Sequence, residues 1–125
     1  MNYNDMIGTP FQEHGNNCYD VIREVYRRNG INIPETNISV CACKSVSDDE
    51  ILKHMANSWE SIDKPEVPCG ILIQSVNPDF ANHIAVYIGQ GKMLHVSLKK
   101  NVCIEKIENW KHKIIGYYKY VGNTD

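Results

Sequence analysis

The sequence predicts an α+β fold, in which an amino-terminal helix packs on a mostly antiparallel sheet of five to six strands. A helical hydrophobic pattern lies near the amino terminus, the period changes near residue 68, and short β-rich runs follow to the carboxyl end. Separate helical and strand regions are typical of α+β proteins. The chain has 125 residues, of which 42% are hydrophobic, so we expect one domain, 1–125, with an ordinary core.

The first helix is predicted in the segment NCYDVIREVYRRNGINIP. Asn17 is a suitable N-cap, and Gly30 can take the left-handed conformation that ends many helices. Cys18 therefore falls in the first turn. The apolar stripe that recurs at helical spacing is Val21, Ile22, Val25 and Tyr26.

A second helix is predicted over residues 47–59. Ser47 and Glu50 form a capping-box pattern at its start. An apolar stripe follows and indicates a buried face, made of Ile51, Leu52, Met55, Ala56 and Trp59. The intervening residues 35–46 have weak periodicity and are expected to form a loop, with room for a short strand.

The carboxyl-terminal half predicts an antiparallel sheet, with strands over 70–76, 83–88, 92–96, 102–107 and 114–121. Gly89-Gln90-Gly91 is a typical hairpin connection. A turn centred on Gln90 places His95 opposite Ala85 and His83 close to a position opposite Ser97. Because side chains alternate along a strand, His83, Ala85 and His95 are expected to share one face.

Composition argues against several partner classes. The formal net charge is −2 with both signs interspersed, so we expect neither a nucleic-acid partner nor a membrane partner. The first 15 residues lack the pattern of a secretory signal, and every apolar run is far shorter than a membrane span. We therefore expect synthesis in the cytoplasm.

The cysteines are expected to be reduced, because their number is odd and no export signal accompanies them. They are Cys18, Cys41, Cys43, Cys69 and Cys103. Cys41 and Cys43 have the wrong spacing for a zinc knuckle, and no second pair follows nearby. We predict no metal and no cofactor.

Cys18, His83 and His95 are the candidate catalytic residues. A cysteine at a helix amino terminus faces unpaired N–H groups and the positive end of the helix dipole, which favour the thiolate. One of two neighbouring histidines can take the thiol proton while the other orients it. The alternative is structural: the cysteine is buried as an apolar group, and the histidines only complete the sheet.

Three segments resemble the NlpC-type superfamily of cysteine peptidases, and most closely its bacteriophage-tail members. They are GTPFQEHGNNCYDVIREVYRRNGINIP, HIAVYIGQGKMLHV and NWKHKIIGYYKYV. The resemblance implies a papain-like fold with Cys18 as nucleophile, His83 as base and His95 as third member. The implied substrate is a peptidoglycan stem peptide, cut beside a γ-linked D-glutamyl residue. Phage-tail proteins are implied as partners, with the protein carried on a virion or released to act on the wall.

The sequence also departs from the family pattern. Asn17 replaces the usual Asp, Tyr19-Asp20 replaces Ser-Gly or Tyr-Gly, and Phe11 replaces a tyrosine whose hydroxyl assists the site. Phe11, Tyr19 and His14 are expected to line the substrate cleft. The changes at Phe11 and Asn17 favour one alternative to hydrolysis, a non-catalytic or weakly active structural module of a phage tail or other assembly. A second alternative keeps the cysteine and histidine and is an acyltransferase on the same fold.

Overall fold

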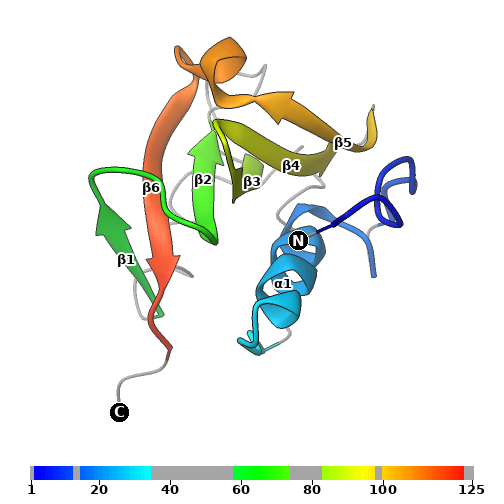
Figure 1. Ribbon diagram of the computed structural model, residues 1–125, viewed down its shortest axis with the longest axis horizontal. Coiled ribbons are helices and arrows are strands. Elements are labelled where there is room, and N and C mark those ends of the chain that lie inside the picture. Colours follow the sequence, from blue (N-terminus) through cyan, green and yellow to red (C-terminus); the bar gives the residue numbers. More distant parts are fainter. Residues whose placement is uncertain (1, 13–14, 35–57, 74–82, 98–99, 123–125) are drawn as a thin grey trace.

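The computed structural model describes residues 2–12, 15–34, 58–73, 83–97 and 100–122. They form one α-helix, a six-stranded sheet and a short 3-10 helix (Figure 1). The elements are α1 (Cys18–Arg28), β1 (Trp59–Ile62), β2 (Cys69–Ile73), β3 (His83–Gly89), β4 (Lys92–Ser97), β5 (Lys100–Lys106), η1 (Ile107–Trp110) and β6 (Ile114–Tyr120). The predicted α+β fold is confirmed. Among these residues, no helix has the length and apolar character needed to cross a bilayer.

The sheet has the strand order β1-β6-β2-β3-β4-β5, and every neighbouring pair is antiparallel. In Figure 1, β6 and β2 run roughly vertically whereas β4 and β5 lie across them, so the sheet is strongly twisted. At the β5 edge, the amino-terminal segment pairs with Val102: the Gly8 N–H donates to its carbonyl at 2.8 Å, and its N–H donates to Thr9 O at 2.9 Å. This pairing covers part of an otherwise open strand edge.

Strand β1 corrects one sequence prediction. Trp59 was expected to end a helix, but it begins β1 and pairs with Tyr120 of β6. The two rings lie edge-on with centroids 5.3 Å apart, and the Tyr26 ring of α1 lies 5.5 Å from Trp59. Aromatic packing across strands and onto the helix therefore outweighs the helical spacing of Trp59. The rest of that predicted helix and the predicted loop over 35–46 lie outside the described residues.

The β3–β4 hairpin has the predicted register. Val86 pairs with Leu94 and Tyr87 with Met93, so these partners are equidistant from Gln90, and the register shifts by one only at Gly89, which pairs with Lys92. Gln90 has a φ of 56°, between two glycines that also have positive φ. The turn itself is Gln90-Gly91, between the paired residues Gly89 and Lys92. Backbone in the left-handed region favours glycine, which explains the glycines on either side of Gln90.

Helix α1 has a complete cap at each end. The Asn17 side chain accepts from the Asp20 N–H at 2.9 Å, and the Asp20 carboxylate accepts from the Asn17 N–H at 3.0 Å. This reciprocal pair is a capping box. At the other end, Gly30 has a φ of 87°, the left-handed conformation predicted for it, and the Ile31 N–H donates to the Tyr26 carbonyl in a Schellman motif.

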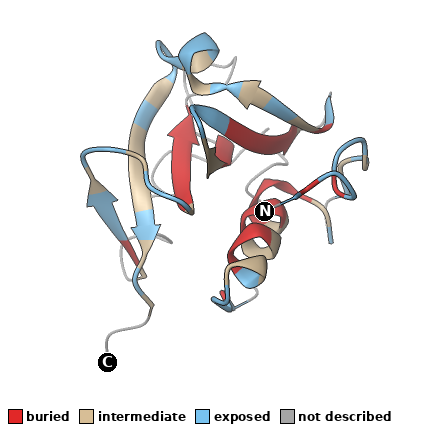
Figure 2. Cartoon of the chain, viewed as in Figure 1, coloured by how far each residue is buried: buried red, intermediate tan, exposed pale blue. Residues whose placement is uncertain are grey.

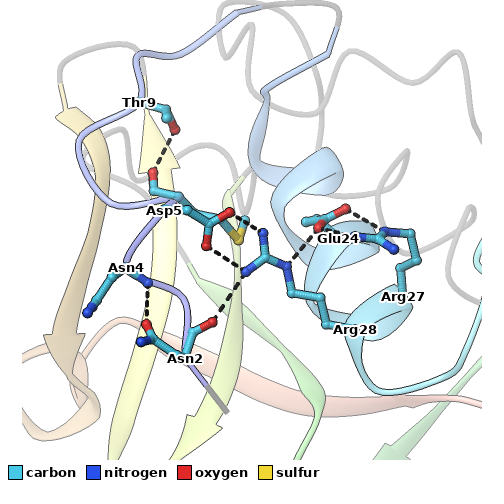
Figure 3. Close-up of polar contacts among 8 residues, drawn as sticks. Asn2, Asn4, Asp5, Thr9, Glu24, Arg27 and Arg28 are labelled. Carbon is cyan, nitrogen blue, oxygen red and sulfur yellow. Dashed lines mark hydrogen bonds and ion pairs between the residues drawn. The ribbon is translucent and has the colours of Figure 1, made fainter.

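The carboxyl end of α1 is tied to the amino-terminal turn by Arg28 (Figure 3). Its guanidinium donates to both oxygens of Asp5 at 2.8 and 2.6 Å, and to Glu24 at 2.7 Å. Arg27 donates to the same Glu24 carboxylate. The hydrogen bond from Arg27, followed by that from Arg28, lowers the pKa of Glu24 to about 2 despite partial burial.

The core lies on both faces of the central strands, and Figure 2 shows the buried residues gathered on β2, β3, β4 and one side of α1. Helix α1 packs on β3 and β4. The helix-side cluster includes Ile22, Leu72, Ile84, Val86 and Leu94, together with Cys18. The second cluster contains Ile71, Ile73, Ala85 and Met93, which alternate with the first set along the same strands and so lie on the opposite face.

Candidate active site

Cys18 is the first residue of α1, as predicted, and it is fully buried in the helix-side cluster. Its sulfur is disulfide-bonded. The expectation of a reduced thiol is therefore wrong at this position, although Cys69 and Cys103 are free as predicted. Spacing along the chain does not reveal which sulfurs the fold brings together. A sulfur held in a disulfide becomes a nucleophile only after reduction.

The structure brings His83 and His95 together from adjacent strands. The Nε2 atom of His83 lies 2.9 Å from Nδ1 of His95, which is hydrogen-bond distance. Their rings meet edge-on with centroids 5.1 Å apart, and both side chains are buried. His83 opens β3, so the pair lies at the margin of the sheet. By strand alternation it belongs to the face of Ala85 and Met93, as the sequence predicted.

Glu105 extends this pair and was not identified from the sequence. Its Oε2 atom is hydrogen-bonded to Nε2 of His95, and its Oε1 atom accepts from Lys100 Nζ at 3.3 Å. In the β4–β5 register, His95 pairs with Cys103, two residues from Glu105. Alternation along the predicted strand 102–107 is a signal that puts Cys103 and Glu105 on one face, but neither that shared face nor the pairing partner of the strand was predicted.

Burial sets the protonation of the two histidines. It lowers the pKa of His83 to about 3, and the neighbouring His95 adds to the effect. Burial also lowers the pKa of His95, although the hydrogen bond and charge of Glu105 oppose it. Burial raises the pKa of Glu105, but His95 and Lys100 outweigh that effect and the net shift is downward. Near neutral pH, two neutral imidazoles therefore adjoin an ionised carboxylate.

Trp110 of η1 completes the surroundings of His95. The two rings lie edge-on with centroids 5.5 Å apart, and Lys113 Nζ lies 5.6 Å from the Trp110 ring centroid. Trp110 also packs against the second cluster, next to the strands that carry the histidines. This packing limits the orientations open to the His95 ring.

The predicted substrate-binding residues are less closely assembled. Phe11 is partly buried and packs against the helix-side cluster, whereas Tyr19 is 4% exposed and belongs to that cluster. Burial raises the pKa of Tyr19. His14 lies outside the described residues, and so do Cys41 and Cys43. The substrate contacts of all three predicted residues remain predictions.

His95, Cys103 and Glu105 are the described groups closest to a possible metal site. One potential ligand atom from each lies within 4.8 Å of the others. However, the His95 nitrogen and the Glu105 carboxylate are already hydrogen-bonded to each other, and Lys100 contacts the same carboxylate. A cation there would compete with the Lys100 charge, so the arrangement fits a hydrogen-bonded chain better than a metal centre.

A cavity of about 350 Å³ lies near the turn of the β3–β4 hairpin and beside β6. Residues that line it include Tyr87, Gly91, Ile107 and Tyr117. None of the predicted catalytic residues lines this cavity, since His83 is at the other end of β3. Aromatic and lysine side chains are among those that line the cavity, and the candidate active site lies elsewhere.

Comparison with protein families identifies one match. Residues 8–119 match the model of the NlpC/P60 family. The match covers α1, the strands β1 to β5, β6 up to Lys119, and the three candidate catalytic residues. No curated protein matches the sequence at a significant level.

Solved structures of NlpC/P60 proteins have a similar fold. An NlpC/P60 family protein from Bacillus cereus ATCC 10987 is 19% identical with a TM-score of 0.63, covering 94% of this chain and 37% of that one. A Staphylococcus aureus subsp. aureus Mu50 protein, described as similar to a lipoprotein of the NLP/P60 family, is 17% identical with a TM-score of 0.55, covering 95% and 39%. The NlpC/p60 domain of the peptidoglycan hydrolase SagA is 16% identical with a TM-score of 0.54, covering 92% and 89%. The likeness concerns the fold, and this chain spans less than two fifths of the first two proteins.

Proposed function

The chain belongs to the NlpC/P60 family, and on that premise we propose that it is a cysteine peptidase acting on bacterial cell-wall peptides. Cys18 is the nucleophile, His83 the general base and His95 the residue that orients the base. The buried His83–His95 hydrogen bond of 2.9 Å carries the proposal, since it joins two histidines on the strands against which the cysteine-bearing helix packs.

The position of Cys18 suits a nucleophile once its disulfide is reduced. As the first residue of α1, it experiences the positive end of the helix dipole, which lowers a thiol pKa. Cys18 belongs to the helix-side cluster and the histidines to the other face. The proposal therefore requires the sulfur to meet His83 at the margin of the sheet, where β3 begins.

In the proposed reaction, His83 takes the Cys18 proton and the thiolate sulfur attacks the peptide carbonyl carbon. The oxyanion is stabilised by the Cys18 backbone N–H, and His83 returns the proton to the departing amine as the C–N bond breaks. Water then attacks the thioester and gives a proton to His83. The C–S bond breaks and the departing sulfur takes the proton back from His83, which releases the carboxylic acid and regenerates the cysteine thiol and the neutral base.

The substrate we propose is a peptidoglycan stem peptide, cut beside a γ-linked D-glutamyl residue. The sequence segments that resemble the family support this substrate. The likeness to the NlpC/p60 domain of a protein named as a peptidoglycan hydrolase also supports it, since this chain covers 89% of that domain structure. Phe11 and Tyr19 are the proposed cleft residues among those described. Contact with phage-tail proteins and location on a virion remain predictions.

The test is hydrolysis of purified muropeptides by the reduced protein, followed by mass spectrometry. We expect cleavage after treatment with a thiol reductant and little without it, because Cys18 is disulfide-bonded in the structure. Cys18→Ala should abolish cleavage, whereas Cys69→Ala, which removes another buried cysteine, should retain it. Full activity of purified Cys18→Ala would refute the assignment.

The buried, disulfide-bonded state of Cys18 specifically favours the second candidate, a structural module without catalysis. The alkylation rate of reduced Cys18 as a function of pH distinguishes the two. A thiol activated by the helix and His83 reacts well below pH 8.5, whereas an inert one reacts only near that value. An acyltransferase would instead give products that carry a transferred acyl group, which the same mass spectra would reveal.

A further inference from the structure

Glu105 adds a fourth residue to the proposed catalytic arrangement of Cys18, His83 and His95. We infer that Glu105 is a positioning residue, whose carboxylate fixes the tautomers of His95 and His83 so that Nδ1 of His83 receives the Cys18 proton. The inference rests on the proposed function and deepens it. It follows from the order of hydrogen bonds along three side chains of β5, β4 and β3.

The first step is the contact between Glu105 and His95. An ionised carboxylate can only accept a hydrogen bond, so the nitrogen that touches it must carry the proton. That nitrogen is Nε2 of His95. The opposite tautomer would place two lone pairs against each other in a buried site, at a large electrostatic cost. Lys100 donates to the second carboxylate oxygen at 3.3 Å and helps to keep Glu105 ionised.

The second step passes from His95 to His83. A neutral imidazole carries one proton, so His95 protonated at Nε2 has a lone pair at Nδ1. This atom lies 2.9 Å from Nε2 of His83 and accepts its hydrogen bond. His83 is therefore protonated at Nε2. Since burial keeps this ring neutral as well, its remaining nitrogen, Nδ1, has the free lone pair.

The consequence is that the general base, His83, has a defined tautomer. Without Glu105, His95 is free to take the other tautomer and donate from Nδ1, which would force His83 to accept at Nε2 and hold its proton at Nδ1. A base in that tautomer has no lone pair for the thiol. Loss of the tautomer-holding carboxylate in a serine protease triad costs about 10⁴-fold in rate. Here His95 remains in place, so we expect a smaller loss of roughly 10- to 100-fold.

The groups that surround Glu105, His95 and His83 are compatible with this order of hydrogen bonds. Cys103 pairs with His95 across the strands, and burial followed by the charge of Glu105 raises its pKa, so it is a neutral thiol. Trp110 packs edge-on against His95, and Lys113 Nζ lies 5.6 Å from the centroid of the Trp110 ring. Lys100 is the described cation that contacts Glu105.

The direct test is ¹⁵N NMR of the histidine side chains in the wild type and in Glu105→Gln and Glu105→Ala. We expect His95 and His83 of the wild type to be protonated at Nε2 and unprotonated at Nδ1 at neutral pH. Glu105→Ala should mix the tautomers of both rings. Glu105→Gln, which keeps an acceptor oxygen and nearly the same shape, should preserve more of the wild-type pattern. Glu60→Ala, which removes an exposed strand glutamate, is the matched control.

The functional readout is the second-order rate of alkylation of reduced Cys18, followed by peptide mass spectrometry. Glu105→Ala should slow alkylation near neutral pH by about 10- to 100-fold, with partial recovery in Glu105→Gln and none of the loss in Glu60→Ala. Unchanged tautomers in Glu105→Ala would overturn the inference. Wild-type protein that has the expected tautomers but cleaves no muropeptide would refute the proposed function and leave the role of Glu105 standing.

Discussion

Buried His83 makes the folded protein sensitive to acid. In the unfolded chain this imidazole binds a proton near its ordinary pKa of 6.5, whereas in the folded protein burial and His95 lower that pKa to about 3. Between these values the unfolded state binds more protons, so stability falls as the pH falls. His83 costs nothing well above pH 6.5, and its full penalty is reached only near pH 3.

The size of the effect follows from the two pKa values. Within the window, each pH unit costs about 1.4 kcal/mol for one group. Because the unfolded state titrates around 6.5, lowering the pH from 7 to 5 should cost about 2 kcal/mol through His83 alone. His95 acts in the same direction. The lowered pKa values of Glu24 and Glu105 contribute mainly below pH 4.5, so this window isolates the histidines.

The assay is urea unfolding followed by tryptophan fluorescence at pH 7 and pH 5, without reductant so that Cys18 keeps one oxidation state. In the wild type we expect the free energy of unfolding to fall by at least about 2 kcal/mol. In His83→Gln the same change of pH should cost about 2 kcal/mol less, whereas His112→Gln controls for the loss of an exposed histidine. Equal pH dependence of wild type and His83→Gln would show that His83 is not buried as a neutral group.

Two further predictions concern elements that hold α1 in place, and both are checked by urea unfolding at pH 7. Asn17→Ala removes the acceptor for the Asp20 N–H and should cost about 1 kcal/mol, whereas a loss below about 0.3 kcal/mol would contradict the capping role. Tyr26→Phe removes a buried hydroxyl that donates to Pro68 O at 3.1 Å and accepts from Tyr120 N–H at 3.3 Å. It should cost about 1–3 kcal/mol, and a variant as stable as the wild type would show that these bonds contribute nothing net.

The hairpin that carries the histidines could be predicted from the sequence because its information is local. The Gly-Gln-Gly turn fixed the centre, and alternation then assigned His83 and His95 to one face. The same holds for α1, whose cap, apolar stripe and Gly30 stop are all within the helix or next to it. In both elements, local geometry and tertiary packing favour the same structure.

The features that the sequence did not predict all depend on contacts between distant segments. Trp59 joined β1 because Tyr120 and Tyr26 pack against it, and neither is near it in the chain. Glu105 reached His95 only because β5 pairs with β4. The disulfide of Cys18 likewise depends on which sulfurs the fold brings close together, and the number of cysteines in the sequence does not predict that.

The structure also gives a physical role to two departures from the family pattern. Asn17 and Asp20 differ from the usual residues beside the cysteine, yet they cap each other across the first turn of α1. The Asp20 carboxylate further accepts from the Gly15 N–H at 3.1 Å and lies 3.6 Å from Arg23. Its charge is therefore offset locally by hydrogen-bond donors and a cation.

This arrangement bears on whether Cys18 can act as a nucleophile. If the Asp20 carboxylate, two residues after Cys18, were uncompensated, its negative charge would disfavour the thiolate. Asn17 is uncharged and has no such effect. Because Asp20 is held by donors on the amino-terminal side of the helix, the dipole that favours a thiolate at Cys18 is opposed less than the sequence suggests. The described features that oppose the proposed nucleophilic role of Cys18 are then its disulfide and the burial of its sulfur, both of which reduction and substrate entry would have to relieve.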